Sequence, residues 1–127
     1  MSVVLDASAT LALLFDETGS NVVEASSRHS LLSAVNLDEV LHKGLSRKGL
    51  PFASTLAFLR KLEIIVAPFD AAQAEIAAAH HERLHRLDIA FGDRACMALA
   101  FVTERPLLTA DRAWSTLGLD LQIIQIR

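Results

Sequence analysis

The sequence predicts an α/β fold in one domain spanning residues 1–127, with helices packed on a mostly parallel sheet. Short apolar segments alternate with helical segments along the whole chain, an order typical of parallel sheets. The length of 127 residues is a common size for one domain, and no repeat or linker divides it. Hydrophobic residues make up 52% of the chain but aromatic residues only 6%, so alanine and leucine dominate and favour helices.

Each element can be assigned from local signals. Capping residues and glycine or proline breaks mark the helix boundaries, such as Gly49 followed by Pro51. The expected strands are 2–5, 31–34, 64–67, 106–109 and 121–126. The expected helices are 9–15, 21–29, 36–48, 52–62, 70–86, one opening at Gly92, and 111–117.

Composition narrows the function. No apolar run approaches the roughly 18 residues of a membrane span, and the first residues lack the basic segment of a secretory signal. The single cysteine, Cys96, excludes an internal disulfide and fits a reducing cytoplasm. A net charge of −3 argues against binding nucleic acid by bulk charge. Any affinity for RNA must therefore come from a local site.

Four acids are expected where strands give way to helices: Asp6, Glu39, Asp93 and Asp111. Asp6 and Asp111 follow two strands, Glu39 lies in the first helical turn after a third, and Asp93 opens a helix. In an open parallel sheet, that edge binds ligands near the point where strand order reverses. Carboxylates brought together repel unless a cation neutralises them, and Mg²⁺ prefers oxygen ligands and binds phosphates. The placement predicts a metal-dependent enzyme acting on a phosphodiester.

Helix capping is the alternative explanation for each acid taken alone. Asn36-x-x-Glu39 resembles a capping box. Asp93 and Asp111 suit the positive end of a helix dipole, and Asp6 could form an Asx turn. Capping does not explain why all four should fall at one edge of the sheet.

Four stretches containing these acids resemble the PIN-domain nucleases: VVLDASA (3–9), VNLDEV (35–40), GDRACMALA (92–100) and LTADRAW (108–114). The likeness is greatest to the VapC-type toxin ribonucleases of bacterial toxin–antitoxin pairs. It implies a three-layer α/β/α fold and Mg²⁺- or Mn²⁺-dependent endoribonuclease activity on RNA. The four acids would form the metal-binding quartet, supported by Ser8 and Thr109. It also implies a cognate antitoxin and a homodimer.

The chain departs from the toxins before Gly92. They often have Gly-Leu-Ser-Leu where this sequence has Asp88-Ile89-Ala90-Phe91. Ala90 lacks a hydroxyl, so any hydrogen bond made by that serine is lost, and Asp88 replaces a flexible glycine and adds a charge. The substitutions bear on the geometry of this loop more than on the metal site.

Several basic and aromatic residues have two interpretations. Arg94 and Arg112 could hold the substrate backbone or pair with neighbouring acids. Trp114 is expected to pack a helix on the sheet rather than stack on a base. The basic edge of the 36–48 helix, Lys43, Arg47 and Lys48, is either solvated or in contact with RNA.

Two other functions remain as alternatives. One is a non-catalytic binding module of the same fold. The other is a zinc hydrolase, because His81-Glu82-x-x-His85 matches the HExxH pattern, in which two histidines bind Zn²⁺ and the glutamate acts as base. Arg83 and Arg86 flank this motif and oppose a cation, and no third ligand is evident, so the match is best explained by chance.

Overall fold

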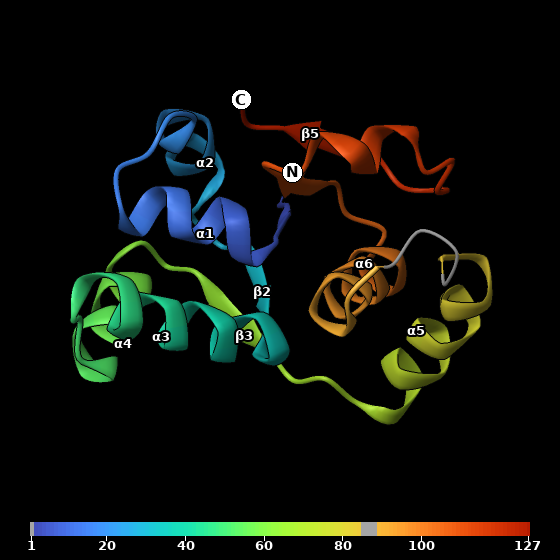
Figure 1. Ribbon diagram of the computed structural model, residues 1–127, viewed down its shortest axis with the longest axis horizontal. Helices are drawn as coiled ribbons and strands as arrows, with labels where there is room; N and C mark the ends of the chain where they lie inside the picture. The colour runs from blue at the N-terminus through green and yellow to red at the C-terminus, as the bar shows by residue number, and fades with distance from the viewer. Residues whose placement is uncertain (1, 85–88) are drawn as a thin grey trace.

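The computed structural model describes residues 2–84 and 89–127. Its five strands form one fully parallel sheet in the order β3-β2-β1-β4-β5. Helices cover both faces, as Figure 1 shows, so the predicted three-layer α/β/α architecture is confirmed. The strands are β1 (Val4–Leu5), β2 (Leu31–Ser33), β3 (Ile65–Ala67), β4 (Leu107–Thr109) and β5 (Ile123–Gln125).

The helices fall into two groups around the sheet (Figure 1). On one side lie α1 (Ala7–Leu14), α2 (Ser20–Ser26), α3 (Ala34–Lys48) and α4 (Phe52–Lys61). On the other lie α5 (Ala71–Leu84), α6 (Phe91–Thr103) and the 3₁₀ helix η2 (Arg112–Thr116). Within the described residues, no helix is both long and apolar enough to cross a bilayer.

Strand alternation produces two hydrophobic cores. Successive side chains of a strand point to opposite faces, so Leu5 and Leu108 join the core beneath α1, α2 and α4. Val4 and Leu107 join the core beneath α6 and η2. Since both faces of β1 and β4 are covered, these strands are apolar on both sides rather than alternating with polar residues.

The order of strands creates a switch point between β1 and β4. The chain runs from β1 outward through β2 to β3, then returns to place β4 on the other side of β1. Val4 lies opposite Leu31 of β2 and opposite Leu107 of β4. In open α/β sheets, ligands bind outside the carboxyl ends of the strands at such a point.

Helix α3 begins earlier than expected. Ser33 is its N-cap and accepts a hydrogen bond from the Val35 N–H at 3.2 Å. The capping-box interpretation of Asn36 was therefore wrong, and Glu39 lies in the second helical turn instead of the first. Asn36 instead donates from Nδ2 to the Gly92 carbonyl at 2.9 Å, which links α3 to the start of α6.

Helix α6 begins at Phe91, with Ala90 as an N-cap that provides no side-chain hydrogen bond. The sequence predicts this, because Ala90 has no hydroxyl that could accept a hydrogen bond from the first turn of the helix. Asp93 lies in the first turn of α6, at the positive end of the helix dipole as expected, although its side chain is not the N-cap.

Trp114 packs η2 against the sheet. Its side chain is only 2% exposed and packs with Cys96 and Met97 of α6, as expected from the sequence. We expect Trp114→Ala to lower the free energy of unfolding by about 3–5 kcal/mol, the usual cost of removing a large buried aromatic group. Phe52→Ala is the control, because Phe52 is 48% exposed and such surface changes stay within about 0.5 kcal/mol. Equal urea midpoints for both variants would contradict this packing role.

Candidate active site

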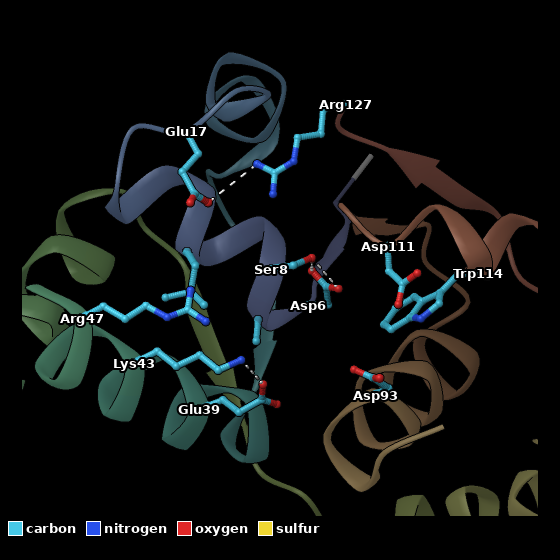
Figure 2. A pocket seen from close by; sticks show the side chains of 12 residues that line it. Asp6, Ser8, Glu17, Glu39, Lys43, Arg47, Asp93, Asp111, Trp114 and Arg127 are labelled. Atoms are coloured by element: carbon cyan, nitrogen blue, oxygen red, sulfur yellow. Dashed lines mark hydrogen bonds and ion pairs between the residues drawn. The ribbon is translucent and has the colours of Figure 1, made fainter. Parts of the chain in front are cut away.

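A cleft of about 240 Å³ lies at the carboxyl ends of β1 and β4, and all four predicted acids line it. Asp6 follows β1, Asp111 follows β4, Glu39 comes from α3 and Asp93 from α6. Figure 2 shows these carboxylates arranged around one space. The other lining residues in the described part of the chain are Ala7, Ser8, Leu11, Glu17, Lys43, Arg47, Trp114 and Arg127.

Asp6 is the most buried and most firmly held acid, with 4% of its surface exposed. Its carboxylate caps α1 by accepting the Ala9 N–H at 2.7 Å. It also accepts the Ser8 hydroxyl at 2.7 Å and the Thr109 hydroxyl at 2.6 Å. Burial raises the pKa of Asp6, and these three donors partly offset that rise. Asp6 therefore serves as a helix cap and as a fixed acid of the cleft.

The two hydroxyls bound to Asp6 also join the two sides of the switch point. Ser8 Oγ accepts the Ala110 N–H at 2.9 Å, and Thr109 Oγ1 accepts the Asp111 N–H at 3.0 Å. Each hydroxyl thus donates to the carboxylate while accepting from the loop after β4. This arrangement fixes the β1–α1 junction against the loop that carries Asp111.

Asp93 experiences the charge of the whole cluster. Its pKa is raised from 3.8 to about 6, first by burial and then by the nearby charges of Asp6, Glu39 and Asp111, while Lys43 opposes the rise. No hydrogen bond to its carboxylate occurs among the described residues. Its place in the first turn of α6 suits the helix dipole, but the dipole does not explain why it shares a cleft with three other acids. Such perturbed carboxylates in clefts are typical of functional sites.

Glu39 is held by contacts on two sides. Asn36 Nδ2 lies 3.4 Å from its Oε1, and Lys43 Nζ lies 3.4 Å from its Oε2, one helical turn further along α3. Gly92 of α6 packs directly against this carboxylate, because a Cβ at Gly92 would collide with Glu39 Oε1. Glycine at this position therefore allows α6 to bring Asp93 toward Glu39.

Asp111 both caps a helix and faces the cleft. Its carboxylate accepts the Ala113 N–H at 3.0 Å at the start of η2. Gln125 of β5 holds the same loop by donating from Nε2 to the Asp111 carbonyl at 2.8 Å. The capping interpretation is thus correct for Asp6 and Asp111, but neither cap prevents the acid from lining the cleft.

The basic residues of the cleft are not the arginines next to the site acids. The Arg94 guanidinium donates to the Ile89 carbonyl at 2.7 Å and lies over the Phe91 ring, 5.8 Å from its centroid. Arg112 is exposed. Neither is among the described residues that line the cleft, where the cations are Lys43, Arg47 and Arg127.

Two of these cations, Lys43 and Arg47, were named in the sequence analysis as part of the basic edge of the 36–48 helix. Arg127 was missed, because it reaches the cleft only through the position of β5 at the edge of the sheet, and no local pattern marks it. The side chains of the proposed zinc motif, His81, Glu82 and His85, lie outside the described residues, as does Asp88.

The donor set fits a hard divalent cation by charge and ligand type. Four carboxylates offer the oxygen ligands that Mg²⁺ and Mn²⁺ accept. After burial, the charges of the other three acids are the next causes that raise the pKa of Asp93. In the described residues, no three His, Cys, Asp or Glu side chains are yet close enough to hold one ion. Binding would therefore require the less buried acids to turn inward toward Asp6.

Parallel strands in the order β3-β2-β1-β4-β5, with acids around the switch point, define an α/β/α domain with an acidic cleft at the edge where such sheets bind ligands. The model of the PIN domain family matches residues 3–118. The chain therefore belongs to the PIN domain family. A comparison with curated proteins finds no significant match.

Solved structures share the fold at low sequence identity. VapBC2 from Rickettsia felis, bound to a DNA fragment from its promoter, is 16% identical, with a TM-score of 0.78 and 98% of each chain covered. VapC20 from Mycobacterium tuberculosis, a sarcin–ricin loop cleaving toxin, is 19% identical, with a TM-score of 0.74, over 95% of this chain and 99% of that one. VapBC-5 from the same organism is 22% identical, with a TM-score of 0.62, over 99% and 98%.

The raised pKa of Asp93 predicts a pH dependence of stability. Because the folded-state pKa of about 6 exceeds the ordinary 3.8, the native state binds more protons than the unfolded state between these values. The free energy of unfolding should therefore fall as the pH rises from about 4 to 7. In metal-free buffer, Asp93→Asn should remove part of this fall and leave the melting temperature at pH 7 unchanged or higher.

The control for Asp93→Asn is Asp38→Asn, which removes an exposed acid of α3 that does not line the cleft. This variant should keep the pH profile of the parent. A lower melting temperature for Asp93→Asn, with an unaltered pH profile, would mean that Asp93 stabilises its helix and is not repelled by the cluster.

Proposed function

We propose that this protein is a Mg²⁺- or Mn²⁺-dependent endoribonuclease and the toxin of a toxin–antitoxin pair. The observation that carries the proposal is the convergence of Asp6, Glu39, Asp93 and Asp111 on one cleft at the β1–β4 switch point. Helix capping accounts for two of these acids, but it accounts for neither Asp93 nor the shared cleft. A cluster of mutually repelling carboxylates is stabilised by a divalent cation.

Asp6 and Asp93 are proposed as the principal metal ligands, with Glu39 and Asp111 completing the set directly or through water. When bound, the metal would supply Lewis-acid polarisation of a phosphoryl oxygen and a water of lowered pKa. Asp6 suits the role of a fixed ligand because three donors hold its carboxylate. Ser8 and Thr109 are the supporting residues, since they orient that carboxylate.

We propose that Glu39 and Asp111 also take part in proton transfer. Glu39 and Asp111 flank the space between Asp6 and Asp93 (Figure 2), where an acid not committed to the metal can accept a proton from the attacking water. Because water rather than the ribose 2′-OH attacks, the products should carry a 5′-phosphate and a 3′-hydroxyl.

The similar structures support the toxin assignment. Several are toxin–antitoxin complexes, and VapC20 is described as a toxin that cleaves the sarcin–ricin loop. By analogy we propose an RNA substrate, a cognate antitoxin, a homodimeric toxin and a cytoplasmic location. A non-catalytic PIN module would bind RNA without cleaving it. A zinc hydrolase would not depend on the four acids of the cleft.

Cleavage of RNA is the direct test of the enzyme. Purified protein should cut single-stranded RNA in Mg²⁺ or Mn²⁺, leave it intact in EDTA, and yield 5′-phosphate ends that a phosphatase removes. Asp93→Asn should abolish cleavage while remaining folded. Thr109→Val should reduce cleavage about 10–100-fold, the usual effect of losing a group that orients a metal ligand.

Two results would overturn the nuclease proposal. One is an intact wild-type protein that binds RNA without cutting it in either metal, which would indicate a binding module. The other is equal cleavage by wild type and Asp93→Asn. Peptide cleavage that is lost on zinc-specific chelation would point instead to His81, Glu82 and His85.

Toxicity in a bacterial host tests the proposal that this protein is the toxin of a toxin–antitoxin pair. Induced expression in a bacterial host should arrest growth, and Asp93→Asn, expressed to the same level, should not. Co-expression of the small DNA-binding protein expected to be encoded beside this gene should restore growth. Unimpaired growth with an active, soluble nuclease would separate the enzymatic activity from the toxin assignment.

A further inference from the structure

The cleft is divided by charge. Among the described residues, five acidic and three basic side chains line it, a net of −2 when all are ionised. In Figure 2, Lys43 and Arg47 extend from α3 on one side, Arg127 approaches from the end of the chain, and Asp111 and Asp93 lie on the other side. A site built only to hold a cation would not need this basic side.

The three cations differ in how their charges are satisfied. Lys43 lies 3.4 Å from Glu39, and Arg127 lies 3.7 Å from Glu17 while also donating to the Thr18 carbonyl at 2.9 Å. Arg47 is exposed, and its guanidinium makes no ion pair or hydrogen bond with any described residue. Arg47 is therefore the cleft cation most available to an anionic ligand.

Helix geometry places Lys43 and Arg47 on the same face. They are four residues apart on α3, which is about one turn and roughly 6 Å along the axis. Lys43 contacts an acid of the cluster, and Arg47 lies one turn farther from it. The charge thus changes from negative to positive along α3, away from Asp93.

We propose that Arg47, with Lys43 and Arg127, binds the backbone phosphates next to the scissile phosphate. The inference rests on the proposed nuclease function and assigns the substrate-positioning residues of that same site. The acid cluster would hold the scissile phosphate through metal, whereas a neighbouring phosphate, carrying its own negative charge, needs a cation from the protein. A guanidinium suits this role because its planar donors match phosphate oxygens.

Contacts to phosphate have a signature that distinguishes them from a structural role. Each phosphate neutralised on a single strand contributes about −0.7 to the slope of log K against log salt. Binding of a fluorescent single-stranded RNA should be measured by anisotropy over a KCl series at constant Mg²⁺. The Asp93→Asn background is used so that the RNA stays intact.

In that background, Arg47→Ala should raise Kd and make the slope shallower by about 0.7. Arg47→Lys keeps the charge and should keep most of the slope. Arg60→Ala is the matched control, because Arg60 is an exposed arginine in the last turn of α4 outside the cleft. A slope for Arg47→Ala equal to that for Arg60→Ala would overturn the inference.

Kinetics in the otherwise wild-type protein separate this inference from the proposed function. Loss of a contact made equally in the ground and transition states should raise KM with kcat unchanged for Arg47→Ala. A drop in kcat at unchanged KM would overturn the positioning role. A further outcome is possible: the wild-type protein fails to cut RNA, yet Arg47→Ala still makes the slope of log K against log salt shallower. That outcome would refute the nuclease function and leave the phosphate-binding role standing.

Discussion

Repulsion among carboxylates gathered in one cleft is the constraint on which the rest of this site depends. Burial raises the pKa of Asp93, and the nearby charges of Asp6, Glu39 and Asp111 raise it further. The fold resists this repulsion locally. Three donors stabilise Asp6, and Lys43 pairs with Glu39. Gly92 acts in the opposite direction, because the absence of a side chain there lets α6 carry Asp93 close to Glu39 of α3. The protein thus uses part of its folding energy to hold an unfavourable charge arrangement, which a divalent cation would relieve.

The topology of the sheet makes the cluster possible. Because β1 and β4 are parallel neighbours at the point where strand order reverses, the residues after them meet although they are about a hundred positions apart in sequence. The Ser8 and Thr109 hydroxyls connect these two junctions through Asp6. Any shift of β4 relative to β1 would therefore disturb both the helix cap and the acid. The junction between β1 and β4 and the position of Asp6 in the cleft therefore depend on the same few hydrogen bonds.

The fold and the four acids could be predicted because the signals are local. Each strand is a short apolar run, Asp6 and Asp111 follow such runs, and Asp93 follows the break at Gly92. Helix starts were less certain, since Ser33 and Asn36 are both good N-caps and only tertiary contact with Gly92 decides between them. The basic side of the cleft was only partly predictable. Arg94 turns away because the Ile89 carbonyl accepts its hydrogen bond, and Arg127 enters through sheet order, which no local pattern encodes.

The most direct test of the account is to locate bound metal. Crystals of the protein grown or soaked with Mn²⁺ should give an anomalous difference peak in the cleft, with carboxylate oxygens of Asp6 and Asp93 as ligands and Glu39 turned inward from its present contacts. A well-ordered cleft that shows no such peak at saturating Mn²⁺, with Asp6, Glu39 and Asp111 keeping their present contacts, would contradict this metal-binding role.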